Sequence, residues 1–394
     1  MASFCLTNIT VYGEYQTFTN GYIKIVEDKI VDVGSMDDLS ESVMDAIEII
    51  SFETGYSAIP GMIDIHIHGV EGVDTMDATI EALTKMSQAL PKEGTTSFLA
   101  TTITQHPDLI AAALKNVADY KRTNNQDEGA ELLGIHLEGP FINANKAGAQ
   151  PIEFIRKPDV NLFKSWQRLA EGFIKIVTLA PEIEGAIPLI NYLKKQGVIT
   201  SIGHSDANST DIDHAIQAGA THVTHLFNGM KGVHHREPGV AGAALLHNEL
   251  KTELIADNIH VHQDMLHLAY KAKGPDNIML ITDAMRAKCL VDGTYDLGGQ
   301  SVHVDGKKAI LDNGTLAGSI LKMSEALKNM KEITKNRFEQ LIQTTSSNQA
   351  KSLNIFDRKG SLTIGKDADV VIIDEQMQVI MTICRGRIIY RRGD

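Results

Sequence analysis

The stretch PGMIDIHIHG, residues 60–69, places polar side chains at alternate positions of an apolar run. Alternate side chains of a β-strand point to the same face, so Asp64, His66 and His68 share one face and the isoleucines share the other. Two imidazoles that face one place are costly to bury unless their ring nitrogens are satisfied, and a divalent metal satisfies both. A pair of hydrogen-bonded core histidines gives the same pattern, so a metal site needs further ligands elsewhere.

Seven further short apolar runs follow this one, and helical patterns separate them. Such alternation is typical of βα units around a parallel sheet. The eight runs are MIDIHIH, TTSFLATT, LLGIHLEG, IKIVTLAPE, VITSIGHS, HVTHLFN, TELIADNIH and IMLITDAM. They predict a (β/α)8 barrel over residues 57–353, and therefore a protein of the α/β class.

The two ends of the chain differ from its middle. Residues 1–56 and 354–394 carry short strand patterns separated by turn-like residues. We expect both ends to meet in one small β-domain beside the barrel. The predicted domains are thus residues 1–56 and 354–394 together, and residues 57–353.

Composition excludes several classes of function. Of 394 residues, 43% are hydrophobic and 22% charged, as in globular proteins, and the net charge of −13 argues against a nucleic-acid partner. No signal-peptide pattern and no bilayer-length apolar run is present, so we expect no membrane partner. Cys5, Cys289 and Cys384 lack metal-type spacing, which favours reduced thiols and a cytoplasmic location.

The carboxyl ends of the predicted strands carry the residues with metal-binding or catalytic chemistry. Barrel enzymes take their catalytic side chains from these ends. Imidazoles and carboxylates without paired thiolates favour Zn(II), Fe(II) or Mn(II). Five ligands are more than one open ion needs, so we expect one or two ions per subunit, with a carboxylate as bridge and an aspartate left for proton transfer. The residues are His66, His68, Glu138, His204, His225 and Asp283.

The motifs HLEGPF, SIGHSDA, THLFN, HHREPG, ITDAM and LAGS, in this order, resemble the amidohydrolase superfamily and, within it, the N-acetylglucosamine-6-phosphate deacetylases. The resemblance covers essentially the whole chain. It implies a β-sandwich made from both chain ends, a homodimer, and a role in amino-sugar catabolism and cell-wall sugar recycling. The implied reaction hydrolyses N-acetylglucosamine 6-phosphate to glucosamine 6-phosphate and acetate.

The resemblance also assigns roles to individual residues. Glu138, His204 and His225 match the core metal ligands, and Asp283 matches the catalytic acid/base. His66 and His68 match a second metal site that only some members keep. Substrate contacts match Ala149, Asn228, Gly229, Arg236, His260, Leu316, Ala317 and Gly318.

Arg236 has a physical reason to bind the phosphorylated amino sugar, because a guanidinium fork matches phosphate geometry and stays charged. The resemblance further implies that Arg236 or His260 reaches the neighbouring subunit's substrate. A helical pattern follows the LAGS segment, so its backbone N–H groups are expected near substrate at a positive helix end.

Two positions depart from the family pattern. Gln150 stands where related enzymes often have a His that polarises the acetamide carbonyl, and Gly229 stands where Ala is common. We hypothesise that the second ion takes over part of that Lewis-acid role. Gln150 and His136, which shares a strand face with Glu138, are expected to support the ligands.

The expected mechanism is attack of a metal-activated hydroxide on the acetamide carbon, with Asp283 first accepting and then returning a proton. Two alternatives stay open. One is an amidohydrolase that acts on cyclic amides or acetylated amino acids through a carboxylated lysine, for which Lys175 is the only strand lysine that suggests itself. The other is a non-catalytic scaffold, which would be expected to have lost ligands.

Overall fold

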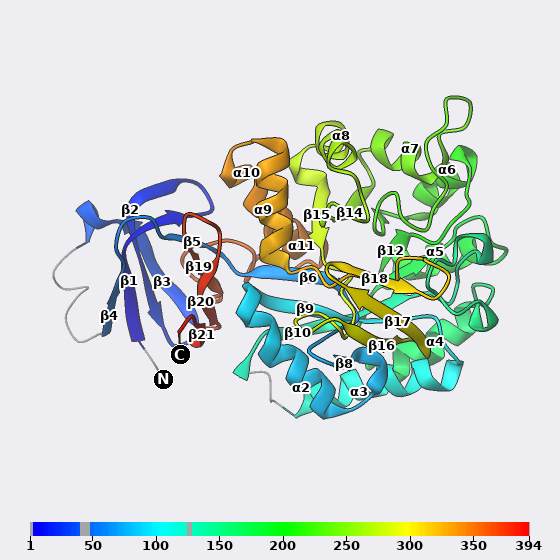
Figure 1. Cartoon of the computed structure of the whole chain (residues 1–394), viewed down its shortest axis with the longest axis horizontal. Coiled ribbons are helices and arrows are strands. Elements are labelled where there is room, and N and C mark those ends of the chain that lie inside the picture. The colour runs from blue at the N-terminus through cyan, green and yellow to red at the C-terminus, as the bar shows by residue number, and fades with distance from the viewer. Residues whose placement is uncertain (1–2, 40–47, 124–127, 394) are drawn as a thin grey trace.

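The computed structural model describes residues 3–39, 48–123 and 128–393, and shows a barrel with a smaller sheet beside it (Figure 1). All eight predicted runs form strands of the barrel, and the predicted fold class is confirmed. In chain order the strands are β6 (Met62–Ile67), β9 (Thr95–Thr102), β10 (Glu131–Glu138), β11 (Ile174–Leu179), β12 (Ile199–Ile202), β13 (His222–Val223), β14 (Lys251–Ile255) and β15 (Ile278–Ile281).

The barrel closes where the end of β15 meets the end of β6. The other neighbours pair in parallel in chain order. At the seam, the Asp283 N–H donates to the His66 carbonyl at 2.8 Å and the His68 N–H donates to the Ala284 carbonyl at 2.9 Å. Backbone hydrogen bonds therefore hold the HxH motif beside the last strand's aspartate.

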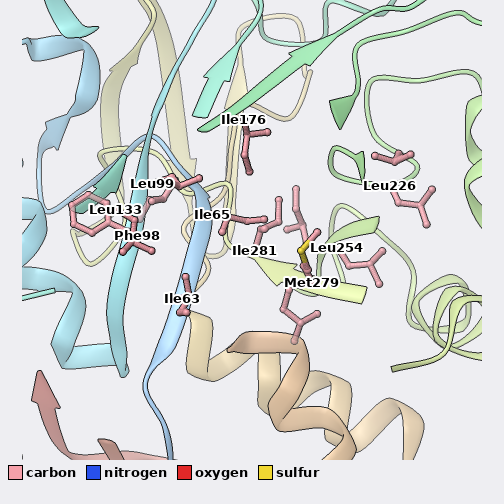
Figure 2. Packing of buried hydrophobic residues seen from close by; sticks show 14 of the residues in the cluster. Ile63, Ile65, Phe98, Leu99, Leu133, Ile176, Leu226, Leu254, Met279 and Ile281 are labelled. Atoms are coloured by element: carbon pink, nitrogen blue, oxygen red, sulfur yellow. The ribbon is translucent and has the colours of Figure 1, made fainter. Parts of the chain in front are cut away.

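The apolar face predicted for the first strand is buried. Ile63 and Ile65 lie in one large cluster with side chains from the other strands, including Leu99 and Met279 (Figure 2). Helices cover the barrel and contribute to this cluster. They are α2 (Ile80–Ala89), α3 (Pro107–Arg122), α4 (Val160–Leu169), α5 (Ala186–Lys195), α6 (Ser209–Ala218), α7 (Gly239–Leu246), α8 (Gln263–Lys273), α9 (Met323–Thr334), α10 (Phe338–Ile342) and α11 (Ser347–Ser352). Within the described ranges, no helix combines the length and apolar composition needed to cross a membrane.

An antiparallel sheet that the sequence analysis did not predict is inserted between β15 and α9. Its strands are β16 (Gly293–Leu297), β17 (Gln300–Asp305) and β18 (Lys308–Leu311). Gln300 Nε2 donates to the Ala149 carbonyl at 2.5 Å, which ties the insertion to the loop after β10. A two-stranded hairpin, β7 (Gly69–Val70) and β8 (Val73–Asp74), follows the HxH motif.

The two chain ends meet in the smaller sheet, as expected. Its strands are β1 (Ser3–Tyr12), β2 (Thr17–Val26), β3 (Lys29–Ser35), β4 (Glu48–Ser51), β5 (Ser57–Pro60), β19 (Val370–Ile373), β20 (Val379–Cys384) and β21 (Arg387–Arg391). Strand β5 pairs with both β1 and β19. Its residues, which the predicted division gives to the barrel, thus lie in the sheet of the small domain.

A buried ionic cluster joins the small domain to the barrel. Lys359 Nζ lies 2.9 Å from Glu131 at the start of β10 and 3.2 Å from Asp367, and it also contacts Asp369. Arg358 adds a two-pronged pair with Glu131. Burial raises the pKa of the Glu131 carboxyl, but Lys359 and Arg358 outweigh burial and hold that pKa well below its usual range. Because the Lys359 side chain is almost wholly buried, each charge depends on its partners.

We predict that Lys359→Ala lowers the free energy of unfolding by ~3–5 kcal/mol, because three carboxylates lose a buried partner. Urea unfolding followed by circular dichroism measures the change. Lys157→Ala is the matched control, since its pair with Glu184 is exposed and is expected to leave the midpoint almost unchanged. Equal losses in both variants would contradict the prediction.

Candidate metal centre and active site

A cavity of about 380 Å³ lies at the carboxyl ends of the barrel strands, which is a volume typical of small-molecule sites. It brings together most of the residues singled out in the sequence. The proposed ligands and proton carrier that line it are His68, Glu138, His204, His225 and Asp283. The predicted substrate or supporting residues that line it are Ala149, Gln150, Asn228, Gly229, His260, Leu316 and Gly318.

The first cluster of the site is Glu138, His204 and His225, at the ends of β10, β12 and β13. His204 Nδ1 faces the Lys146 carbonyl at 2.8 Å and His225 Nδ1 faces the Asn228 carbonyl at 3.1 Å. A carbonyl only accepts, so each Nδ1 carries a proton, and in the neutral ring, which is the form that binds a metal, each Nε2 carries a lone pair. Both Nε2 atoms lie 3.1 Å from Glu138 Oε1 and 3.1 Å from each other. Three acceptor atoms thus converge with no proton between them.

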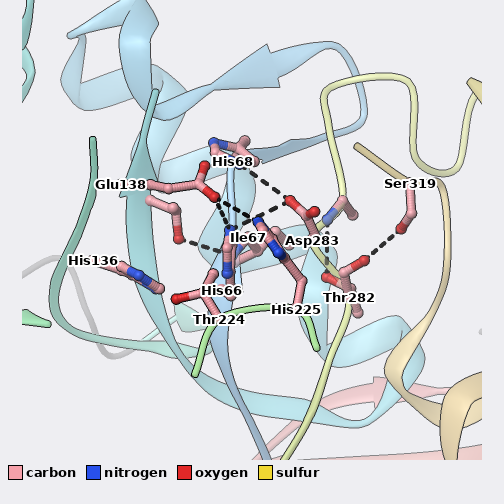
Figure 3. A network of polar contacts seen from close by, with 12 residues as sticks. His66, Ile67, His68, His136, Glu138, Thr224, His225, Thr282, Asp283 and Ser319 are labelled. Carbon is pink, nitrogen blue, oxygen red and sulfur yellow. Dashed lines mark hydrogen bonds and ion pairs between the residues drawn. The ribbon is translucent and has the colours of Figure 1, made fainter. Parts of the chain in front are cut away.

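The second cluster is His66, His68 and Asp283 (Figure 3). His66 Nδ1 lies 3.0 Å from Glu253 Oε2, and its Nε2 is buried without a hydrogen-bond partner among the described residues. Asp283 Oδ1 lies 3.4 Å from His66 Nε2 and 3.2 Å from His68 Nε2. Glu138 Oε2 lies 3.3 Å from His68 Nε2, so the two oxygens of Glu138 serve the two clusters.

The pKa shifts show how strongly this site favours positive charge. Burial alone lowers the pKa of His68, but hydrogen bonds to Asp283 and Glu138 raise it to about 10. Burial raises the pKa of the Asp283 carboxyl, but the neighbouring His66 and His68 lower it to about 2. Burial raises the pKa of Glu138, but His66, His204 and His225 outweigh burial and hold that pKa well below its usual range.

Both clusters fit divalent ions. In each, the three ligand atoms lie within 4.8 Å of one another. Bare acceptors packed at about 3 Å repel one another, and a cation between them turns that repulsion into coordination. The unpartnered Nε2 of His66 needs the same compensation. Nitrogen and carboxylate donors without thiolates match zinc, iron or manganese.

Backbone strain is concentrated at the same place. His204, His225 and Asp283 have φ values of 48°, 30° and 47°, in the left-handed region that residues with a side chain seldom adopt. Each such residue costs about 1–3 kcal/mol, and strain of this kind collects at functional sites. The strained backbone therefore lowers the stability of the fold, and it directs these three side chains into one cavity.

Gln150 is hydrogen-bonded to one candidate ligand, and the His136 ring packs against another, with its centroid 4.5 Å from that of His66. Gln150 Nε2 donates to Glu138 Oε2 at 2.8 Å, and its Oε1 accepts from the Thr104 N–H at 2.7 Å. Both polar ends of that side chain are thus engaged in holding the carboxylate. His136 Nδ1 donates to the Ile65 carbonyl at 2.9 Å, and its Nε2 lies 2.7 Å from Thr178 Oγ1. Burial lowers the pKa of His136 to about 4, so this ring is neutral.

The loop after β13 explains the glycine at position 229. Gly229 has φ of 57°, and a Cβ there would lie 3.0 Å from His204 Nδ1. Glycine adopts this backbone conformation without strain and leaves room for the His204 ring. On the other side of the cavity, His260 Nδ1 lies 2.7 Å from Asp257, whose carboxylate raises the pKa of His260 against the effect of burial.

Arg236 and Ala317 do not line the cavity. Arg236 is exposed, with Nη1 2.8 Å from His235 Nε2, and Ala317 is buried in an apolar cluster under the inserted sheet. Lys175 is also elsewhere, since its ammonium lies 3.4 Å from the Gly172 carbonyl. This placement removes the only candidate for a carboxylated-lysine bridge.

Sequence reasoning missed several residues of the site. Glu253 lies under the second cluster. Further residues line the cavity from loops and from the inserted sheet, where alternating side chains and the Gly298-Gly299 turn were the available signals. They are Ile103, Gly148, Leu297, Gly314 and Thr315.

Known proteins share this sequence and architecture. The model of the amidohydrolase family matches residues 57–389. The N-acetylglucosamine-6-phosphate deacetylase of Bacillus subtilis (strain 168) is 51% identical, over 98% of this chain and 97% of its own. The N-acetylgalactosamine-6-phosphate deacetylase of Escherichia coli O157:H7 is 38% identical, over 84% of this chain and 86% of its own.

A solved structure extends the match to three dimensions. A mutant of the N-acetyl-D-glucosamine-6-phosphate deacetylase of Mycobacterium smegmatis, in complex with N-acetyl-D-glucosamine-6-phosphate, is 28% identical and superposes with a TM-score of 0.92. The match covers 99% of this chain and 100% of that chain. The chain therefore belongs to the amidohydrolase family and, within it, to the N-acetylglucosamine-6-phosphate deacetylases.

Proposed function

We propose that this enzyme hydrolyses the acetamide of N-acetylglucosamine 6-phosphate to glucosamine 6-phosphate and acetate, in the cytoplasm, as part of amino-sugar catabolism. The observation that carries the proposal is the convergence of His204 Nε2, His225 Nε2 and Glu138 Oε1 in the cavity, beside Asp283. Such a centre suits metal-assisted hydrolysis of an amide. The substrate follows from the relatives, which cover almost the whole chain.

Glu138, His204 and His225 would hold one ion, and His66 and His68, together with Glu138, would hold a second. Ions bound there would supply Lewis acidity, lowering the pKa of water towards ~7 and polarising a carbonyl. Zinc, iron and manganese all fit this donor set.

Asp283 carries the proton. Its low pKa keeps the carboxylate ionised at neutral pH, so that it accepts a proton from the attacking water. As the C–N bond of the amide breaks, the same carboxyl returns that proton to the departing nitrogen. Water and amide are thereby converted to acetate and the protonated amine, with no net proton lost or gained by the enzyme.

The cavity lining offers few partners for the phosphate group of the proposed substrate. Among the described lining residues none is a lysine or an arginine, and His260, whose pKa the Asp257 carboxylate raises, is the one histidine that lies outside the two clusters. A phosphate dianion needs charge-assisted donors. We propose a homodimer in which Arg236 of one protomer, exposed on its own chain, reaches the cavity of its partner.

The experiment that tests the function measures acetate release by metal-analysed protein. N-acetylglucosamine 6-phosphate, its galactosamine epimer and unphosphorylated N-acetylglucosamine are compared, each with and without a chelator. We expect the phosphorylated glucosamine derivative to be hydrolysed fastest and the chelator to abolish turnover. Faster turnover of the galactosamine epimer would instead make N-acetylgalactosamine 6-phosphate the preferred substrate, as the name of the Escherichia coli relative indicates for that protein.

We predict that Asp283→Asn lowers kcat by about 10²–10⁴-fold, because the amide cannot accept the proton. Metal content measured by mass spectrometry is expected to stay at one ion or more, since Glu138, His204 and His225 are unchanged. Asp64→Asn is a control that alters a neighbouring buried aspartate outside the cavity. Turnover near that of the wild type in Asp283→Asn would remove this residue from the mechanism.

We predict that Arg236→Gln raises KM for the phosphorylated sugar about tenfold to a hundredfold and leaves KM for the unphosphorylated sugar unchanged. Arg337→Gln is the matched control, because Arg337 is an exposed arginine outside the cavity.

Mixing Arg236→Gln with Asp283→Asn tests which protomer uses the arginine. If Arg236 acts across the dimer, a randomised mixture regains about a quarter of wild-type activity at low substrate, since half of the dimers hold one intact site of two. No recovery in exchanged dimers would place Arg236 in its own protomer's site or outside the reaction.

A further inference from the structure

Glu253 is a buried carboxylate that the proposed reaction does not use. It lies on β14, its residue is 0% exposed, and it does not line the cavity. Its Oε2 lies 3.0 Å from His66 Nδ1 and 3.4 Å from the backbone N of His225. Its Oε1 is buried and has no hydrogen-bond partner among the described residues.

Stability alone does not account for this carboxylate. A buried charge costs several kcal/mol unless it is well paired, and an apolar residue of similar size is often as stable or more stable. The group that Glu253 meets side chain to side chain is the His66 imidazole, within a barrel interior of β-branched and aliphatic residues. The negative charge of Glu253 is compensated when a positive charge lies on the His66 ring or next to its Nε2 atom.

The geometry of His66 shows where that positive charge belongs. Because the carboxylate only accepts, His66 Nδ1 carries the proton and donates it to Glu253. The lone pair is then on Nε2, which is the atom without a partner and the one near Asp283 and Glu138. Glu253 thus fixes the tautomer of the ring and increases the basicity of its free nitrogen.

A third ion between His66, His136 and Glu253 is not needed to explain the carboxylate, although the three lie close enough to form a ligand group. Both ring nitrogens of His136 are already occupied, one by the Ile65 carbonyl and the other by Thr178 Oγ1. His66 Nδ1 is likewise occupied by Glu253 itself. This group therefore has no free lone pair for an ion. The ring nitrogen with a free lone pair is Nε2 of His66.

We propose that Glu253 is a positioning residue for the second cluster: through His66 it sets the affinity of the second divalent ion. The inference rests on the proposed function only in that His66 is taken as a metal ligand. It assigns the buried negative charge of β14 to the second ion. The contact of Glu253 with the first cluster is the longer one, 3.4 Å from its Oε2 to the backbone N of His225.

The experiment measures binding of Zn²⁺ alone, without sugar, to the metal-stripped full chain by competition with a chromophoric chelator. Wild type is expected to bind two ions, and Glu253→Gln is expected to bind the weaker of them 10- to 100-fold less tightly. Binding at the first cluster is expected to be unchanged. Glu253→Leu is expected to lose the second ion, and the nearly isosteric Glu253→Gln carries the test if the leucine variant fails to fold.

The matched control is Glu93→Gln, which removes a buried carboxylate whose partner is Lys288. This variant is expected to lose stability in chelator while keeping both Zn²⁺ affinities. Glu253→Gln is expected to show the reverse, with apo stability kept and the second affinity reduced. Loss of apo stability in Glu253→Gln with both affinities intact would make the residue structural and overturn the proposal.

A double-mutant cycle of His66 and Glu253 tests whether Glu253 acts through His66. In a His66→Asn background, Glu253→Gln is expected to change neither Zn²⁺ affinity, because the ring through which it acts is gone. An unchanged effect in that background would overturn the proposal. Since no sugar is present, normal Zn²⁺ binding without deacetylation would refute the proposed function and leave this inference intact.

Discussion

The site depends on one electrostatic conflict. Glu138 presents both carboxylate oxygens to four imidazoles, two of which have their protons committed to backbone carbonyls on the far side of the ring. Acceptors held this closely repel one another, and only cations between them make the arrangement favourable. The strained backbone at three strand ends, the amide of Gln150 and the closing seam of the barrel all keep this arrangement from relaxing.

Most of the metal site was predictable from the sequence because two structural rules act together. The two-residue period of a strand decides which side chains share a face, and the barrel decides that strand ends share a rim. His66, His204 and Asp283 each lie at or just beyond the end of an apolar run, so their convergence follows from local pattern alone. The meeting of the two chain ends was predicted from their strand patterns and is confirmed by the bridges of Gly13 with Leu362 and of Lys29 with Asp367.

What the sequence did not predict depends on long-range geometry. Glu253 sits in the middle of a run, where one carboxylate among apolar residues gives no hint of its partner 187 positions away. The inserted sheet was overlooked because its strands are short and half exposed, and a barrel pattern does not require them. The left-handed backbone at His204 and His225 depends on tertiary contacts, because most histidines do not adopt this region even though histidine is enriched there.

The inserted sheet separates two kinds of change that the protein can accumulate. The metal ligands lie at the ends of barrel strands, where a substitution disturbs the core, whereas Leu297, Thr315 and Leu316 line the cavity from the insertion and its following loop. The candidate metal ligands and part of the remaining cavity wall thus come from different parts of the chain. A substitution in the insertion can therefore reshape the cavity without moving a candidate ligand.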